Sequence, residues 1–314
     1  MKKAKRSIST LFHNLSFLSR NDIRGLLRED LRHVMFQSSF ACFVANSNDI
    51  ENGEEKSSAI DYVKDTGRFD MIPYRQVRDS RPFSCGFDET SKLPYVVHEG
   101  RNLYFPASWS AEKMSSMYKH FIEDEQLTGE RYRTHAPHCY VADDFRIDPE
   151  DVLIDVGCAE GLLSFAFIQK ISHVYLIEND PEWFSPIEAS FKNYLGEKAT
   201  MVRKTVDSYD SENTISLRTI IEEDPRQSFF IKMDIEGAEV KVLDSVVDYL
   251  RDTRKKIKLA VCCYHRQSDA KKIEGLVKAM GFSYVFSDGY ILAPFYDPSE
   301  MYSLRRGVIR AKNF

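Results

Sequence analysis

A strand, a glycine turn and the start of a helix follow one another between Val152 and Gly161, and this run limits the fold more than any other stretch. The apolar residues 152–156 have the composition of a strand that is buried on both faces of a parallel sheet. Gly157 and Gly161 stand four residues apart, so the backbone can turn sharply there and come close to a ligand. The sequence therefore predicts an α/β protein with a ligand beyond the carboxyl end of this strand.

The spacing of the turn residues indicates which kind of ligand fits. Asp155, Gly157 and Gly161 form Asp-x-Gly-x-x-x-Gly, which differs from the Gly-x-Gly-x-x-Gly that dinucleotide-binding enzymes use to hold a pyrophosphate. Glu178 ends the next apolar run, about 20 residues further on, where a carboxylate can accept both ribose hydroxyls. A ligand with a ribose and an ammonium group but no phosphate suits this pattern, and S-adenosylmethionine is such a ligand. The alternative is that Glu178 is a surface carboxylate that only ends a strand.

The composition excludes several classes of protein. The 314 residues suffice for one large domain or two modest ones. A net charge of −5 gives no general attraction to nucleic acid or to an anionic membrane. No apolar stretch approaches the 18 residues of a membrane span, and the N-terminal residues are too polar for a secretory signal. Six cysteines without a Cys-x-x-Cys pair favour buried free thiols, so we expect a cytoplasmic protein.

Residues 1–145 are predicted to form an N-terminal α+β accessory region that serves substrate binding or oligomerisation. Apolar residues recur every three or four positions between Leu11 and Val34, which predicts a helix that packs on the core or joins two copies into a homo-oligomer. The polar run 46–58 is expected to be a loop. Residues 95–105 form a predicted hairpin with a glycine in its turn, and a helix is expected from Ser108 to about Gln126.

Residues 146–314 alternate strands with helices, as a doubly wound sheet requires. Further strands are expected at 200–202, 228–233 and 258–263, and a terminal hairpin pairs 284–286 with 290–292. A terminal hairpin after five strand–helix units is unlike a dinucleotide domain. It resembles the Rossmann-like, seven-stranded sheet of class I methyltransferases, whose last strand is antiparallel.

Two runs and a strand end carry a more specific resemblance. Residues 155–161 and 231–239, followed by Tyr264 and His265, resemble the FkbM family of S-adenosylmethionine-dependent methyltransferases over roughly residues 150–295. The glycine turn is shared by many methyltransferases, whereas the Lys-x-Asp-x-Glu-Gly-x-Glu run that starts at Lys232 is much more specific. The resemblance implies O-methylation of a hydroxyl, on a sugar or glycan intermediate or on a small metabolite.

The resemblance also implies roles for individual residues. It puts Asp155, Gly157 and Gly161 around the methionine part of the cofactor, and Glu178 on the ribose. Asp234 and Glu236 would face the sulfonium and the incoming hydroxyl. One departure is Cys158-Ala159-Glu160, where the family often has small or amide residues. The expected cofactor-binding residues are Asp155, Gly157, Cys158, Gly161, Glu178, Asp207 and Asp234, and the expected catalytic residues are His265, Asp234 and Glu236.

Removal of the hydroxyl proton requires a base. His265 is the first candidate because it ends a strand on the ligand side, where Asp269 could orient its ring. Alternatively, His265 only caps the helix that follows it, and His135 or His138 reaches in from the preceding connection.

Other residues near the predicted site admit two interpretations. Carboxylates 234, 236 and 239 could bind magnesium, but acidic residues are favoured in a first helical turn anyway, so we expect no metal. Lys232 lies within a strand and needs a partner if it is buried. Four aromatic residues could stack on a sugar or on adenine, or could simply pack in the core: Tyr104, Phe105, Trp183 and Tyr264.

Three functions therefore compete. An O-methyltransferase acting on a small molecule or glycan is favoured, without nucleic acid as a partner because no Asn-Pro-Pro-Tyr-like loop follows the fourth strand. A nicotinamide-dependent oxidoreductase would share the acidic second strand but lacks the phosphate-binding glycines. A catalytically silent scaffold that binds the cofactor is the third.

Overall fold

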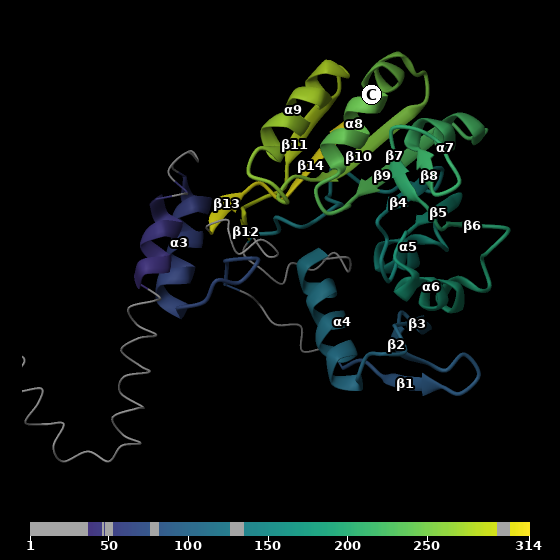
Figure 1. Cartoon of the computed structure of the whole chain (residues 1–314), viewed down its shortest axis with the longest axis horizontal. Helices are drawn as coiled ribbons and strands as arrows, with labels where there is room; N and C mark the ends of the chain where they lie inside the picture. Colours follow the sequence, from purple (N-terminus) through teal and green to yellow (C-terminus); the bar gives the residue numbers. More distant parts are fainter. Residues whose placement is uncertain (1–36, 46, 48–52, 76–81, 126–134, 294–301) are drawn as a thin grey trace, which may run out of the picture.

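A computed structural model describes residues 37–45, 47, 53–75, 82–125, 135–293 and 302–314 (Figure 1). The predicted helix between Leu11 and Val34, and with it the expected oligomer contact, lies outside these residues. Residues 37–45 are helical. Among the described helices, none combines the length and the apolar composition that crossing a membrane requires.

A seven-stranded sheet forms the centre of the molecule, in the order β11-β14-β10-β9-β4-β5-β6. Numbered by their order along the chain, these strands run 3-2-1-4-5-7-6 across the sheet. All are parallel except β14, which is antiparallel to both of its neighbours. The predicted Rossmann-like methyltransferase sheet with an antiparallel last strand is therefore confirmed. The strands are β4 (Val152–Val156), β5 (His173–Ile177), β6 (Ala199–Val202), β9 (Ser228–Met233), β10 (Lys256–Cys262), β11 (Ser283–Phe286) and β14 (Val308–Lys312).

The predicted terminal hairpin is wrong in its pairing. β11 pairs with β14, with Tyr284 opposite Ala311, while β12 (Ile291–Ala293) pairs with β13 (Ser303–Arg305) in a separate ladder. The turn signal at Gly289 is real, since its φ is +89°. Gly289 packs against Tyr74 and His135. The chain after the turn therefore leaves the central sheet. Local turn chemistry gave no information about a partner strand that lies about 20 residues further along.

Helices cover both faces of the sheet, and alternate strand residues point to opposite faces. On β9, Phe229 and Ile231 join the core under α7 (Leu217–Glu223), α8 (Glu239–Asp252) and α9 (Asp269–Ala279). Phe230 joins the opposite core, under α5 (Leu162–Phe167), α6 (Phe184–Phe191) and the accessory region. By the same alternation, Lys232 on β9 and Asp155 on β4 point to this second face as well.

In the described residues, the accessory region contributes a small sheet, the helical residues 37–45 and two further helices. β1 (Cys85–Asp88), β2 (Leu93–His98) and β3 (Arg101–Tyr104) form an antiparallel ladder, which confirms the predicted hairpin. The polar run 46–58 was expected to be a loop throughout, but α3 (Glu54–Thr66) begins within it because Glu54 and Glu55 suit a first helical turn. α4 (Ala111–Glu125) packs beside β1 and β2 of this sheet, and β3 lies next to α6 (Figure 1). The remaining elements are η1 (Pro181–Trp183), β7 (Thr205–Asp207) and β8 (Thr214–Ser216).

Candidate active site

A cavity of about 600 Å³ lies beyond the carboxyl ends of β4, β5 and β9. Its walls are the glycine turn after β4, the residues after β5, the residues after β9, the end of α4, and the segment around His138. Ligands of open α/β sheets bind at this edge of the sheet. The sequence predicted this location, although it gave no indication that α4 closes one side.

Only glycine fits at position 157, because the backbone there is left-handed and leaves no room for a Cβ atom. Its φ is +70°, and a Cβ placed there would lie 2.1 Å from the carbonyl oxygen of Asp234. The amides of Gly157 and Cys158 both donate to the carbonyl oxygen of Ile177, at 2.9 and 3.1 Å. The turn is therefore held between the ends of β9 and β5, and its backbone lines the cavity.

Glu178 lines the cavity and is only 8% exposed, so it is not an ordinary surface carboxylate. Its Oε1 accepts from the amides of Asn179 and Asp180, at 2.8 and 2.9 Å. Its Oε2 accepts from the amide of Ala159 at 3.0 Å. A carboxylate has about four acceptor positions. Three are used to fix the group, and one is left for a ligand.

Asp155 and Lys232 lie behind the glycine turn and form a buried ion pair. They face each other on β4 and β9, with Lys232 Nζ 3.2 Å from Asp155 Oδ1. Lys232 Nζ also donates to the carbonyl oxygen of Gly157 at 2.5 Å, and Ser164 Oγ donates to Asp155 Oδ2 at 2.6 Å. Burial acts to lower the pKa of Lys232, but the carboxylates of Asp155 and Asp234 raise it above its ordinary value. Asp155 thus supports the turn without lining the cavity.

Of the other predicted cofactor-binding residues, Cys158, Gly161 and Asp207, only the first lines the cavity. Gly161 (φ +72°) precedes α5 and packs against Phe191 rather than facing the cavity. Asp207 directs its carboxylate to Lys241, at 2.6 Å, while its neighbour Val206 lines the cavity.

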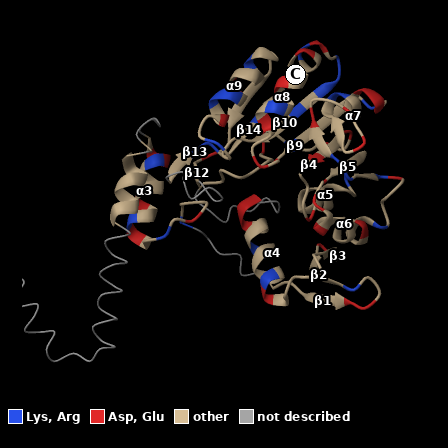
Figure 2. Ribbon diagram, viewed as in Figure 1, with Lys and Arg blue, Asp and Glu red and all other residues tan. Residues whose placement is uncertain are grey.

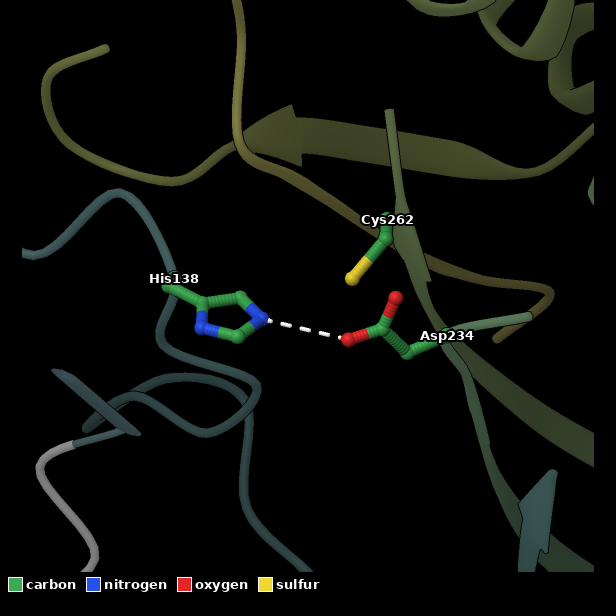
Figure 3. Close-up of side chains that lie close together, drawn as sticks. All are labelled: His138, Asp234 and Cys262. Atoms are coloured by element: carbon green, nitrogen blue, oxygen red, sulfur yellow. Dashed lines mark hydrogen bonds and ion pairs between the residues drawn. The ribbon is translucent and has the colours of Figure 1, made fainter. Parts of the chain in front are cut away.

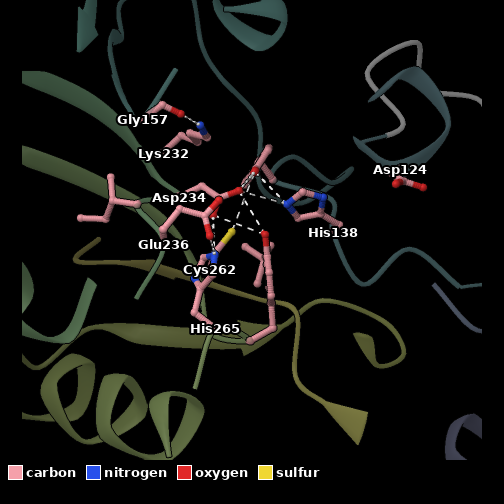
Figure 4. A network of polar contacts seen from close by, with 12 residues as sticks. Asp124, His138, Gly157, Lys232, Asp234, Glu236, Cys262 and His265 are labelled. Carbon is pink, nitrogen blue, oxygen red and sulfur yellow. Dashed lines mark hydrogen bonds and ion pairs between the residues drawn. The ribbon is translucent and has the colours of Figure 1, made fainter. Parts of the chain in front are cut away.

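Asp234 also lines the cavity and is the centre of a hydrogen-bonded cluster (Figures 3 and 4). Its Oδ2 accepts from Tyr140 OH at 3.0 Å and from Tyr264 OH at 3.3 Å, and His138 Nε2 lies 3.4 Å away. Burial acts to raise the pKa of Asp234, but the hydrogen bond and charge of His138, together with Lys232 and His265, hold it well below its usual range. Asp234 is therefore an ionised acceptor of hydrogen bonds.

His265 lies beneath this cluster, with a side chain that is 7% exposed, and is absent from the cavity lining. Its Nδ1 is 3.1 Å from Glu239, and its Nε2 is 3.3 Å from Asp234 and 3.4 Å from Glu236. The predicted orienting residue Asp269 instead accepts the amide of Arg266, so that prediction was wrong and Glu239 holds the ring. Burial acts to lower the pKa of His265, but these carboxylates, Glu239 foremost, raise it. The ring is therefore held among carboxylates and lies outside the cavity lining.

Glu236 lines the cavity with a side chain that is 68% exposed. Its φ of +55° is uncommon for a residue with a side chain. Such conformations concentrate at functional sites. The following residue, Gly237, also has a positive φ, of +92°, so the chain turns sharply between β9 and α8 and leaves Glu236 at the surface of the cavity.

The alternative histidines and the aromatic residues divide between site and core. His138 lines the cavity, whereas His135 packs on Tyr74 beside Asp288. Trp183 and Tyr264 line the cavity, and Tyr104 and Phe105 are core residues. Sequence reasoning missed Tyr140, Glu160 and Glu125, which all line the cavity. Tyr140 is far from Asp234 in sequence and meets it only in the folded chain. The sequence therefore gave no sign of its role beyond its place next to His138 and Cys139.

No protein-family model matches the chain, and no curated protein sequence matches it. Among solved structures, the methyltransferase FkbM from Methylobacillus flagellatus is similar at 18% identity, over 53% of this chain and 44% of that one, with a TM-score of 0.40. The chain thus spans less than half the length of that protein. Precorrin-6y C5,15-methyltransferase from Geobacter metallireducens is similar at 14% identity over 54% and 82%, with a TM-score of 0.35. TYW2 from M. jannaschii in complex with AdoMet is similar at 14% over 75% and 88%, with a TM-score of 0.34. With TM-scores this low, the similarities carry no inference about activity.

Proposed function

We propose that the protein is an S-adenosylmethionine-dependent methyltransferase that methylates a hydroxyl of a small metabolite or of a sugar or glycan intermediate. One observation carries the proposal: the glycine turn and Glu178 line one cavity at the edge of a sheet with the order 3-2-1-4-5-7-6. Dinucleotide-binding folds have the parallel order 3-2-1-4-5-6. The antiparallel β14 between β10 and β11 therefore favours the methyltransferase over the nicotinamide-dependent oxidoreductase.

The residues of the cavity fit the parts of this cofactor. Gly157 and Cys158 line the cavity with their turn, which suits close approach of the methionine part to the backbone. Glu178 would accept one ribose hydroxyl at its remaining acceptor position, and Thr205 and Val206 would lie beside the adenine. Asp155 and Gly161 would act indirectly, by holding the turn. The bound cofactor would supply an electrophilic methyl group on a sulfonium.

The far end of the cavity offers groups for the acceptor. Asp234 would accept a hydrogen bond from the hydroxyl and orient it, because its low pKa keeps it ionised. As the oxygen–carbon bond forms and the sulfur–carbon bond breaks, the hydroxyl proton would pass to the exposed carboxylate of Glu236. His265 lies close to both carboxylates but outside the cavity lining, so it would position them rather than act as the base.

The charge of the cavity supports a small acceptor over a nucleic acid. The carboxylates outnumber the lysines among the lining residues, and this potential would repel a chain of phosphates. The acidic lining residues are Asp124, Glu125, Glu160, Glu178, Asp180, Asp234 and Glu236, and the lysines are Lys204 and Lys232.

Calorimetric titration with S-adenosylmethionine and with S-adenosylhomocysteine tests the proposal. Glu178→Gln should weaken binding by about 10- to 100-fold, since a hydrogen bond to a charged group is worth about 1.5–3 kcal/mol. Glu197→Gln, on an exposed carboxylate outside the cavity lining, is the matched control and should bind as the wild type does. Thermal unfolding of both variants would separate loss of binding from loss of folding.

Each other outcome has a definite meaning. Binding of NAD without binding of either adenosyl ligand would favour the oxidoreductase. Binding without a methylated product from extracts of glycans, lipids and metabolites would favour the silent scaffold. No heat with any of these ligands would contradict the proposal.

A further inference from the structure

A second hollow, of about 720 Å³, lies between α8 and α9, and we call it the α8–α9 groove. Half-buried Val240 and Leu276 give it apolar surface. Figure 2 shows basic residues on both helices. Four basic residues line the groove: Lys241, Arg266, Lys271 and Lys272. The groove therefore differs from the active-site cavity, whose lining holds more acidic residues than lysines.

Three of these residues, Arg266, Lys271 and Lys272, form no ion pair within the described part of the chain, and we call them the groove cations. Lys241, by contrast, pairs with Asp207 at 2.6 Å. Lys271 and Lys272 occupy the third and fourth positions of α9. The helix dipole disfavours cations near an N-terminus and favours anions. A bound anion would therefore compensate the groove cations.

Gly275 keeps the groove open at a cost to α9. It stands inside the helix, where glycine is less favourable than alanine. Packing does not require the glycine, because nothing lies within 4 Å of the position that its Cβ would take. A side chain at this lining position would instead occupy the groove. The residue therefore favours an open groove over a more stable helix.

Asp269 indicates that the ligand also brings a hydrogen-bond donor. This residue lines the groove and is 1% exposed. Its Oδ2 accepts the amide of Arg266 at 2.9 Å, whereas its Oδ1 has no hydrogen bond within the described residues. Buried polar groups in proteins nearly always have a partner, and a hydroxyl of the ligand would supply one. The other acidic lining residue, Asp244, is exposed, so four basic and two acidic residues leave the groove positive.

We propose that the α8–α9 groove binds a phosphorylated small molecule of the nucleoside diphosphate type. Its phosphates would lie beside the groove cations, which suit phosphate oxygens. A ribose hydroxyl would donate to Asp269, and the base would pack on Val240 and Leu276. Apolar surface with a few polar groups that fix orientation is the usual composition of a small-molecule site.

The groove lies next to the active-site cavity. Glu236 lines the cavity, and the following residue, Gly237, lines the groove. Arg266 packs against Gly237, with its Cζ 3.6 Å from the position that a Cβ would take there. An acceptor whose diphosphate is held in the groove would place only its uncharged, hydroxyl-bearing part in the acidic cavity. This role rests on the proposed function, and it narrows the acceptor to a nucleotide-linked sugar.

Calorimetric titration of the full chain with the diphosphates of uridine, adenosine, guanosine and cytidine tests the site. At least one should bind with one molecule per chain, and its nucleoside without phosphates should bind at least 10-fold more weakly. The double substitution Lys271→Gln and Lys272→Gln should weaken binding by about 10- to 100-fold, the range for loss of a hydrogen bond to a charged group. Lys278→Gln removes a charge from the same helix outside the groove lining, so it should bind as the wild type does.

Gly275→Leu separates loss of binding from loss of folding. Leucine favours a helix more than glycine does, and the Cβ position is open, so the unfolding temperature should stay the same or rise. The leucine should nevertheless weaken diphosphate binding more than 10-fold, because it fills the groove. Unchanged binding in this variant would overturn the proposal.

Three further outcomes would also overturn it. The first is absence of binding by all four diphosphates at millimolar concentration. The second is binding of inorganic pyrophosphate as tight as that of the best nucleoside diphosphate, which would indicate a general anion site. The third is loss of diphosphate binding in Glu178→Gln, which would place the ligand in the active-site cavity.

Titration of the same protein with S-adenosylhomocysteine separates this inference from the proposed function. Binding of S-adenosylhomocysteine without binding of any diphosphate would contradict only the groove site. Diphosphate binding that Gly275→Leu abolishes, without binding of S-adenosylhomocysteine, would support the groove site and contradict only the methyltransferase.

Discussion

At the scale of single residues, Gly157 connects the fold to the site. Because it has no side chain, Gly157 can adopt a φ of +70°. For the same reason the carbonyl oxygen of Asp234, just after β9, can approach its Cα closely. The glycine turn and the chain that carries Asp234 are thus held together by one close backbone approach. A change at Gly157 should disturb both at once.

Gly157→Ala should destabilise the protein by several kcal/mol. A left-handed backbone costs an alanine about 1–2 kcal/mol, and the new Cβ would overlap the oxygen 2.1 Å away. Gly196→Ala is the matched control, because Gly196 has a φ of +87° but nothing within 4 Å of its Cβ position. It should lose only the backbone contribution. Urea unfolding of the two variants measures both costs, and equal losses would contradict the overlap.

Glu160 should make stability depend on pH. Burial, aided by Asp155, raises the pKa of Glu160 to about 7 in the folded protein. Because the folded pKa lies above the unfolded one, the contribution of the protonated form is complete below about pH 4.5 and is lost as pH rises toward 7. Glu160→Gln should therefore gain stability relative to the wild type above pH 7, by up to about 3 kcal/mol. Thermal unfolding at pH 5 and pH 8 measures this, and a gain that is equal at both values would contradict the assignment.

At the scale of helices and strands, buried apolar runs were predictable and long-range pairing was not. Residues 152–156 and 228–233 match β4 and β9 because a strand buried on both faces must be continuously apolar. β14 escaped prediction because residues 308–312 mix apolar residues with Arg310 and Lys312. Its place between β10 and β11 depends on partners elsewhere in the chain.

A buried ion pair links β4, β9 and β10 at the amino ends of these strands, opposite the cavity. Lys258 Nζ, on β10, lies 2.7 Å from Asp151, which precedes β4. Ser228 Oγ, at the start of β9, donates to the same carboxylate at 2.6 Å. Asp151 is 0% exposed, so removal of its cation would leave a buried charge without compensation.

Lys258→Ala should therefore destabilise the protein by about 3–5 kcal/mol, the usual cost of breaking a buried pair from one side. Lys256→Ala, which alters the exposed first residue of the same strand, should cost no more than about 0.5 kcal/mol. Denaturant unfolding of the two variants compares them. A small effect at position 258 would mean that water or rearrangement compensates Asp151.

At the scale of the whole molecule, the candidate site is assembled from segments that are far apart in sequence. Asp234 and Glu178 were predictable because each directly follows a buried strand. Tyr140 and His138 precede β4, and Glu125 ends α4, so only the folded chain brings them to the cavity. Their residue types carry no positional signal. The sequence therefore indicated the lining residues that follow β4, β5 and β9 much better than those contributed by α4 and by the segment before β4.

Residues 43–74 and residues 290–304 meet in a third apolar cluster beside the sheet. Phe43, Ala59 and Val63 pack there with Leu292 and Leu304. The amide of Leu292 donates to the carbonyl oxygen of Met71 at 2.8 Å. Residues after β11 thus stabilise the accessory region. The proposed boundary between 1–145 and 146–314 assigns these residues to the other unit.

Leu292→Ala should loosen this cluster more than the central sheet. Leu292 is 0% exposed, and truncation of a buried leucine costs about 2–5 kcal/mol. Hydrogen exchange followed by mass spectrometry should show faster exchange in α3 and in residues 37–45, with β4 and β9 little changed, because local contacts set local opening. Leu243→Ala, in the core between α8 and the sheet, should show the reverse pattern. If both variants accelerated exchange uniformly, the cluster and the sheet would unfold as a single cooperative unit, and the accessory region would have no independent stability to adjust the acceptor side of the cavity.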